Sequence, residues 1–179
     1  MYVNQPVNQR NRDRSLNTRR LAKGDPPLSE QPSARTALHL KRTFDAPRKE
    51  VFGAWTDPEL FAQWFRVPGA STPAVDMDVR VGGSYRVEWS GELAGNLVGT
   101  YLDVEPPERL VYTLRWDPPW HRVMDTGDTQ VTVEFRDLGH ETEVILIHER
   151  LGLDEEVREF NKWGWTSAMD RLAELLEPR

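Results

Sequence analysis

Regular alternation of apolar and polar residues begins at Leu38, after a long polar stretch. Leu38, Leu40 and Phe44 share one parity and polar residues take most of the other, which is the period-two pattern of a half-buried strand. Arg42 has the same parity as these apolar residues, so the pattern points its charged side chain inward. The sequence therefore predicts a first strand over residues 38–44.

Two short helices are predicted directly after this strand. Ala46-Pro47 opens the first, because proline is tolerated in a first turn where its missing N–H costs nothing. Asp57 can cap the second helix, which has Pro58 in its first turn and ends at Pro68-Gly69. The first helix has the apolar residues Val51, Phe52 and Trp55 at helical spacing. The second has Leu60, Phe61, Trp64 and Phe65.

From residue 73 to residue 150 the chain is a series of alternating segments separated by Gly and Pro, typical of an antiparallel meander. Six further strands fit this region. The residues expected on their common inner face are Val75/Met77/Val79, Tyr85/Val87/Trp89, Val98/Thr100/Leu102/Val104, Leu110/Tyr112/Leu114/Trp116, Val131/Val133/Phe135 and Val144/Leu146/His148.

A long helix is predicted at the C-terminal end, over residues 154–177. Asp154 is a plausible N-cap, and two glutamates follow it in the first turn, where negative charge suits the helix dipole. One stripe of this helix is apolar and consists of Trp165, Met169, Leu172 and Leu176. The expected fold is therefore α+β and of the helix-grip type: a seven-stranded curved antiparallel sheet around a long C-terminal helix, with two short helices after the first strand.

Composition limits the chain to one domain, since it has 179 residues, of which 38% are hydrophobic. It contains no cysteine, which excludes disulfide scaffolds, thiolate metal sites and cysteine nucleophiles. No segment approaches the roughly 18 consecutive apolar residues of a membrane helix, and the N-terminus has no apolar core of a signal peptide. We therefore expect a cytoplasmic protein that does not insert into membranes.

Residues 1–36 differ from the rest of the chain in amino-acid composition and in charge. Residues 1–35 contain seven Lys/Arg and three Asp/Glu, a net charge of +4, whereas the whole chain carries −6. The segment is rich in Asn, Gln, Ser and Pro and buries too little apolar surface to offset chain entropy. We expect a disordered basic leader, followed by one domain over residues 37–177. A nucleic-acid-binding arm would show denser charge and more aromatic residues than Tyr2 alone, so no nucleic-acid partner is expected.

Five segments in this order carry a family resemblance: RTFDAPRKEVFGAWTDPELFAQWF, DMDVRVGGSYRV, GTYLDVEPPERLVYTLRW, TEVILIHERL and NKWGWTSAMDRLAELLE. They resemble the bacterial homologues of the Hsp90 ATPase activator, within the START-like (SRPBCC) superfamily. The resemblance covers residues 37 to 177. It implies a cavity between sheet and helix that often binds an apolar or aromatic small molecule and sometimes catalyses a reaction on it. It does not imply one particular reaction.

Aromatic side chains are the first candidates for the wall of such a cavity, because rings stack and the indole N–H orients a ligand. The candidate ligand-binding residues of this kind are Trp64, Trp89, Tyr101, Trp116 and Trp163. Core filling is the alternative for all of them, and it is the preferred interpretation for Trp55 and Trp165, which lie on stripes that pack helix against sheet.

Two polar residues are also candidates for ligand binding. His148 shares the inner parity of the last strand, where it could orient a ligand or move a proton, or could simply be satisfied by a protein acceptor. Arg42 could meet an anionic ligand, or it could form a structural ion pair, which is the preferred interpretation.

No metal and no cofactor is expected, because the four histidines lack ligand spacing and Gly82-Gly83 precedes a strand, as a hairpin turn does. The preferred function is binding of a small hydrophobic or aromatic molecule, by a monomer or homodimer. A cyclase- or hydrolase-like enzyme that uses His148, Arg42 or Tyr101 is the alternative. The third hypothesis is a co-chaperone that acts on an Hsp90-type ATPase through its surface. It is weakened because the leader lacks the large N-terminal domain of the eukaryotic activators.

Overall fold

The computed structural model describes residues 37–66, 70–92, 94–117, 128–152 and 154–177. All of them belong to one compact unit, Pro32–Arg179. The expected leader, residues 1–36, lies outside the described residues, so its disorder stays a prediction. Within the described part, no helix is both long and apolar enough to cross a membrane.

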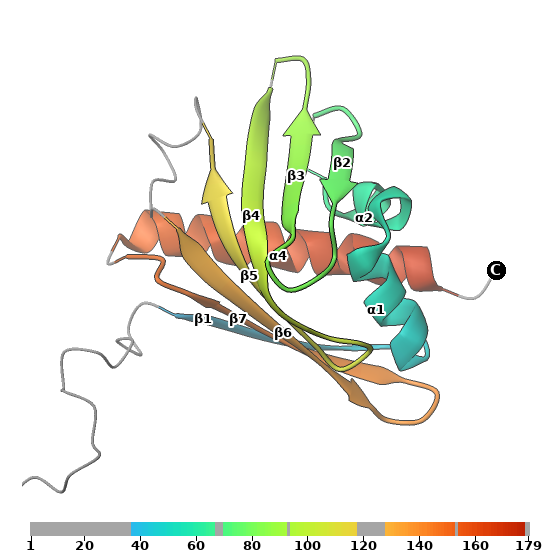
Figure 1. The fold of residues 1–179 in the computed structure, drawn as a ribbon. Coiled ribbons are helices and arrows are strands. Elements are labelled where there is room, and N and C mark those ends of the chain that lie inside the picture. Colours follow the sequence, from blue (N-terminus) through green and yellow to red (C-terminus); the bar gives the residue numbers. More distant parts are fainter. Residues whose placement is uncertain (1–36, 67–69, 93, 118–127, 153, 178–179) are drawn as a thin grey trace, which may run out of the picture. The chain divides into compact units, whose positions relative to one another are not determined.

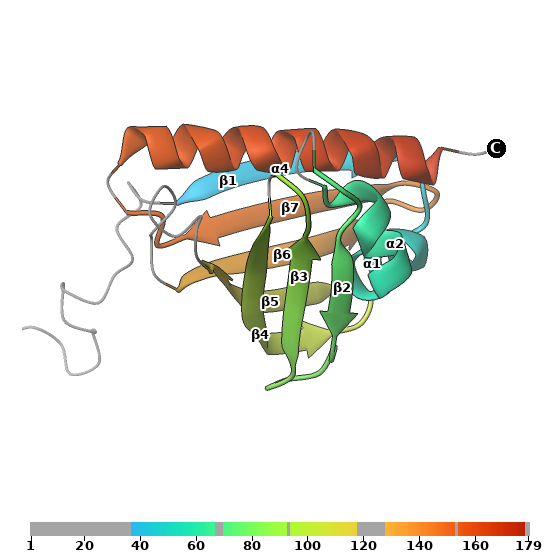
Figure 2. The same cartoon turned by 90° about the horizontal axis from the view of Figure 1, so that it is seen from above.

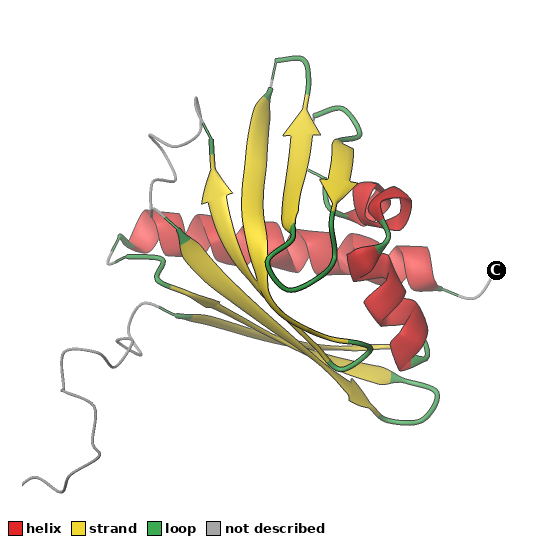
Figure 3. Cartoon of the chain, viewed as in Figure 1, coloured by secondary structure: helices red, strands yellow, loops and turns green. Residues whose placement is uncertain are grey.

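The described chain consists of seven strands and three helices in the predicted order (Figure 1, Figure 3). In chain order they are β1 (Leu38–Phe44), α1 (Arg48–Thr56), α2 (Pro58–Trp64), β2 (Ala74–Met77), β3 (Ser84–Trp89), β4 (Gly95–Glu105), β5 (Arg109–Trp116), β6 (Thr129–Asp137), β7 (Thr142–Glu149) and α4 (Glu155–Leu176). The strands form one antiparallel sheet in the order β1-β7-β6-β5-β4-β3-β2. The predicted α+β helix-grip fold is confirmed.

The sheet bends so strongly that β2, β3 and β4 run at a steep angle to β1, β7 and β6 (Figure 1, Figure 2). The long helix α4 lies along β1 on the inner side of this bend, and α1 and α2 pack at one end of it. Such curvature follows from the twist of a sheet with many strands. The sheet thus covers α4 on one side, and the two short helices close the space at the end.

Local sequence explains where the helices begin. Asp57 caps α2, since its carboxylate accepts the backbone N–H groups of Glu59 and Leu60 at 2.8 and 3.1 Å. Asp154 caps α4 in the same way, with Glu155 and Glu156 in its first turn. Both caps were predicted from the sequence and both are confirmed.

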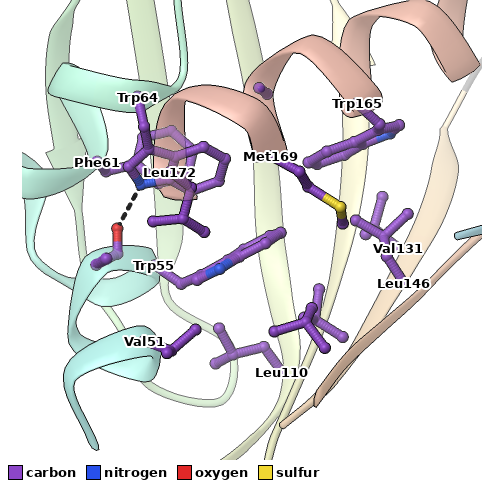
Figure 4. Close-up of a cluster of buried hydrophobic side chains, with 14 of the residues drawn as sticks. Val51, Trp55, Phe61, Trp64, Leu110, Val131, Leu146, Trp165, Met169 and Leu172 are labelled. Carbon is purple, nitrogen blue, oxygen red and sulfur yellow. Dashed lines mark hydrogen bonds between the residues drawn. The ribbon is translucent and has the colours of Figure 1, made fainter. Parts of the chain in front are cut away.

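The core lies between α4 and the sheet (Figure 4). Trp165 and Met169 of α4 lie toward Val131 and Leu146 of the sheet, and Leu172 lies beside Trp64 of α2. Each of these six side chains is at most 4% exposed. Trp55 of α1 stacks on Trp165, with ring centroids 5.9 Å apart, as the core-filling interpretation predicts for this pair. Burial of this aliphatic and aromatic surface is the main force that holds α4 against the concave face of the sheet.

The predicted inner face of β4 was wrong over most of its length. Leu97 and Tyr101 are 1% and 3% exposed, whereas Leu102 is 45% exposed, so the opposite parity faces the core. Val104 still packs against the core, because the pairing of β4 with β5 shifts between Tyr101 and Asp103. Such a bulge adds one residue and reverses the alternation. A prediction that extended one parity along the whole strand could not accommodate it.

Candidate functional site

A small space remains inside the domain between the sheet and the two short helices. Its volume is about 10 Å³, roughly the size needed for one water molecule. Apart from Met77 and Leu110 its lining is aromatic, and the lining residues are Trp55, Phe61, Met77, Tyr85, Tyr101, Leu110 and Tyr112. Among these described residues the interior is therefore almost filled by side chains.

Three tyrosines form one wall of this space, and we call them the tyrosine cluster: Tyr85 of β3, Tyr101 of β4 and Tyr112 of β5. Their ring centroids lie 5.6 to 6.0 Å apart. Burial raises the pKa of each phenol above its ordinary value, so all three hydroxyls stay neutral at physiological pH. The Tyr85 hydroxyl donates to the backbone oxygen of Thr113 at 2.8 Å.

The absence of a side chain at Gly99 makes room for this arrangement. A Cβ there would lie 2.5 Å from the Tyr85 ring and 1.9 Å from the Thr113 oxygen. Any larger residue would push the Tyr85 ring out of the tyrosine cluster.

Trp55 faces the same space with an unused donor. Its side chain is 2% exposed, and its indole Nε1–H has no hydrogen-bond partner in the described part of the chain. A buried donor without an acceptor is costly, and such groups are rare in folded proteins. Trp64, by contrast, packs on Trp55 at 4.8 Å and donates its own N–H to the Ala54 backbone oxygen at 2.8 Å (Figure 4). Trp64 therefore has a structural hydrogen bond, and Trp55 is the residue with a free donor.

Trp89 and Trp116 form a second aromatic element. Their rings stack at 5.6 Å with 24° between the planes. Trp89 is 2% exposed, and none of the residues that the structure describes accepts its indole N–H. Phe65 links this pair to the core, since its ring lies 6.2 Å from Trp89 and 5.6 Å from Trp165. The aromatic wall is thus continuous from Trp116 to Trp55.

His148 is completely buried, and both of its ring nitrogens are occupied. Trp165 Nε1–H donates to Nδ1 at 3.1 Å. The Thr129 hydroxyl donates its proton to the Leu114 backbone oxygen at 2.8 Å, so His148 Nε2–H must donate to Thr129 Oγ1, 2.7 Å away. His148 is therefore a neutral imidazole with its proton on Nε2. Burial lowers its pKa from 6.5 to about 3.

The remaining two candidates lie away from the small space. The guanidinium of Arg42 forms an ion pair with Asp170 of α4 and lies 5.6 Å from the centre of the Phe44 ring, so the preferred structural interpretation agrees with its contacts. Trp163 is 50% exposed on α4 and packs beside Phe160, with centroids 5.7 Å apart.

The structure thus brings Tyr101 into contact with the interior space and Trp64 next to it, with Trp89 and Trp116 on the adjoining wall. Tyr85, Tyr112 and Trp55 were not among the sequence-predicted site residues. The signal for the two tyrosines was available, because both have the inner parity of their strands, β3 and β5, which lie on either side of β4. Among the described residues, no three His, Asp or Glu side chains come together in a way that could hold a metal ion.

A family model described as Activator of Hsp90 ATPase homolog 1-like protein matches residues 45–177 of the chain. Among solved structures the chain resembles protein CV1439 from Chromobacterium violaceum, with a TM-score of 0.68 and 28% sequence identity, over 80% of this chain and 99% of that one. It also resembles PFC0360w, an HSP90 activator from Plasmodium falciparum, with a TM-score of 0.63 and 21% identity, over 79% of this chain and 96% of that one. At that identity the second likeness shows the fold alone.

A curated relative is the uncharacterized protein C1711.08 of Schizosaccharomyces pombe, which is 34% identical over 73 residues. The match spans 41% of this chain but only 18% of the length of that protein. Because the family model matches most of the chain and the fold is the one that its structural relatives share, this chain belongs to the Activator of Hsp90 ATPase homolog 1-like protein family.

Proposed function

We propose that the chain binds a small apolar or aromatic molecule between its sheet and its helices, against Trp55 and the tyrosine cluster. The observation that carries this proposal is the buried indole N–H of Trp55, a residue that lines the interior space, because this N–H has no acceptor among the described residues. Leaving such a donor unpaired costs about 1–3 kcal/mol, which an acceptor on a ligand would offset. The aromatic rings around it supply stacking surface, and they are arranged for a ligand that also contains a ring.

Entry of a ligand requires side chains to move, since the present space is only about 10 Å³. Phe61 comes from the short helix α2 and Met77 from the four-residue edge strand β2. Because these two elements are short, their side chains can move aside with the smallest loss of packing energy. Binding is expected to change the environment of Trp55 and Trp64, which makes tryptophan fluorescence a direct reporter.

The experiment is a thermal-shift and fluorescence screen of the full chain against small aromatic compounds, in pairs with and without a carbonyl acceptor. A ligand at 100 times its Kd adds about 2.7 kcal/mol of stability. We expect Trp55→Phe to weaken the carbonyl-bearing members roughly tenfold and to leave their acceptor-free partners unchanged. Trp163→Phe, at an exposed site, is the control for loss of a tryptophan. If diverse compounds all fail to raise the melting temperature, the proposal is wrong.

The site favours binding over acid–base catalysis through His148. In the neutral form both ring nitrogens of His148 already have partners, so the imidazole has no free lone pair with which to accept a substrate proton. Arg42 is held in an ion pair with Asp170. Tyr101 is a neutral phenol at physiological pH, so it can donate a hydrogen bond to a ligand but does not act as a base.

We infer a second candidate function, binding to an Hsp90-type ATPase through the surface. It rests on family membership and on the exposed aromatic pair Phe160 and Trp163, which are 41% and 50% exposed on α4. Exposed aromatic residues are enriched at protein interfaces. The test is the ATPase rate of an Hsp90-type chaperone with and without the chain. Stimulation that disappears in Trp163→Ala supports this function, and an unchanged rate with the wild-type chain rejects it.

A further inference from the structure

The outer face of the sheet, away from α4, carries a groove of about 420 Å³. This volume falls in the range of roughly 300–1,000 Å³ that is typical of small-molecule sites. Most of its lining is polar, and the lining residues are Asp76, Ser84, Tyr85, Arg86, Val98, Gly99, Thr100, Thr113, Arg115 and Asp128. The groove is therefore chemically unlike the aromatic interior.

The alternation of β3 separates the groove from the interior. Ser84 and Arg86 are exposed, whereas Tyr85 and Val87, the neighbours of Arg86 along the strand, are buried on the core side. The groove and the interior space thus lie on opposite faces of the sheet, with only the Tyr85 side chain contributing to both. A ligand in the groove would not need to open the core.

The groove forms where the backbone pairing between β4 and β5 is interrupted. Val98 and Tyr101 have paired residues in β5, but Gly99 and Thr100 between them do not. There the Thr100 backbone N–H donates to Thr113 Oγ1 at 3.0 Å, and the Thr113 backbone oxygen accepts the Tyr85 hydroxyl at 2.8 Å. Side chains thus replace two backbone partners, and the floor consists of short residues with hydroxyl groups. The Thr113 hydroxyl keeps its own proton for a further acceptor.

Charged residues cross this floor in one row. Asp76, Arg86, Val98 and Arg115 are successive Cα partners across β2, β3, β4 and β5. Since neighbouring strands lie about 4.8 Å apart, the two arginines stand roughly 10 Å apart with Val98 between them. Asp128, just before β6, adds a second carboxylate beyond Arg115. Donors therefore lie in the middle of the groove and acceptors at its ends.

Among the described residues, neither guanidinium has a carboxylate at the distance of a charge-assisted hydrogen bond. The nitrogen–oxygen distances from Asp117 are 3.9 Å to Arg86 and 3.5 Å to Arg115, and that from Asp128 to Arg115 is 3.7 Å. A charge-assisted hydrogen bond is about 2.7–2.9 Å long. The two arginine side chains are 48% and 53% exposed, so these loose pairs hold them weakly. Most of their N–H donors are available to a ligand.

We propose that this groove binds a neutral polyhydroxylated molecule the size of a mono- or disaccharide. The two arginines and two aspartates of the lining cancel in charge, and the Asp117 carboxylate beside both arginines adds one negative charge, so the groove has no net attraction for an anion. A hydroxyl group both donates and accepts, and a polyol can therefore donate to Asp76 and Asp128 while it accepts from Arg86 and Arg115. An apolar ligand would leave all of these groups unpaired.

The test is a titration of the isotopically labelled full chain, followed by backbone amide NMR shifts. The probes are glucose, galactose, myo-inositol and maltotriose, with inorganic phosphate and naphthalene as chemical controls. We expect at least one polyol to shift the amides of Val98, Thr100 and Thr113. Stronger binding of maltotriose than of glucose would identify the end of a longer glycan as the ligand, and the reverse order a free sugar.

Substitutions in the groove test whether the polyol binds there. Arg86→Ala and Arg115→Ala should each weaken binding by about tenfold, because each removes a charged hydrogen-bond donor. Arg136→Ala is the matched control, since Arg136 is an exposed arginine of β6 with its own ion pairs to Glu134 and Glu143. The proposal fails if no polyol shifts these amides, if phosphate or naphthalene binds there more tightly, or if both groove variants bind as the wild type does.

Discussion

At the scale of single residues, the buried polar groups of this domain divide into satisfied and unsatisfied ones. His148 has a partner for each ring nitrogen, through Thr129 and Trp165. The indole N–H groups of Trp55 and Trp89 are equally buried and have none. Satisfied buried groups stabilise a unique packing, whereas unsatisfied ones cost free energy and require another explanation. The candidate hydrogen-bonding groups for a ligand are therefore the indole N–H groups of Trp55 and Trp89, and not the His148 ring.

Removing the Thr129 hydroxyl should destabilise the domain measurably. Thr129→Val keeps the shape of the side chain but leaves His148 Nε2–H without an acceptor, which costs about 1–3 kcal/mol of unfolding free energy. Urea denaturation measures the loss. Thr132→Val on the same strand, where the side chain is only partly buried on the outer face, should change stability by less than about 0.5 kcal/mol. Equal effects of the two substitutions would contradict the His148 network.

His148 should also make stability depend on pH in a defined direction. Its pKa is about 3 in the folded state, against 6.5 for an unburied imidazole. Between these values the unfolded chain binds a proton that the folded chain does not, so the free energy of unfolding falls as pH falls from about 6.5 toward 3. The slope from this group approaches about 1.4 kcal/mol per pH unit.

Two measurements check this pH dependence. Urea denaturation at several pH values should show a smaller slope in His148→Gln than in the wild type. Nitrogen NMR of the native His148 ring needs no variant, and it should report a neutral imidazole with the proton on Nε2 throughout pH 4 to 6. Protonation of the ring near pH 6 in the folded protein would refute the assignment.

At the scale of elements, the patterning predicts the strands and helices well, because each buries a face with a fixed period. It fails in β4, where one bulge between Tyr101 and Asp103 reverses the parity. The spacing also separates Trp163 from Trp165: two positions correspond to about 200° around the helix, so the two side chains lie on opposite faces, and Trp163 is 50% exposed. The Thr129–His148 contact depends on strand pairing, which alternation alone does not reveal.

The register of β4 can be tested with one substitution made at two sites. Leu97→Ala removes a side chain that is 1% exposed and should cost about 2–5 kcal/mol. Leu102→Ala removes one that is 45% exposed and should cost far less. Chemical denaturation of both variants gives the comparison. A larger loss for Leu102→Ala would restore the parity that the sequence first indicated.

At the scale of the whole domain, two arginine side chains add polar ties between α4 and the elements around it. Arg42 of β1 pairs with Asp170, which fixes the edge of the sheet to the helix. Arg171 does the same for α2, since its Nε donates to the Trp64 backbone oxygen at 2.9 Å and its Nη2 to that of Arg66 at 2.8 Å. Arg171 therefore anchors to α4 the end of α2 that carries Phe61 and Trp64 over the interior space.

Arg171→Ala should loosen α2 while leaving most of the sheet unchanged. The two lost hydrogen bonds come from a charged donor, so the free energy of local opening should fall by about 1.5–3 kcal/mol, and the α2 amides should exchange with solvent at least about tenfold faster. Native-state hydrogen exchange measures this, with the amides of β6 and β7 as the internal reference. Arg158→Ala on the same helix, which removes a 3.4 Å contact to the Gly152 oxygen, is the matched control. Uniform acceleration across the domain would show that α2 opens only by global unfolding, and the entry route for a ligand would then have to lie elsewhere.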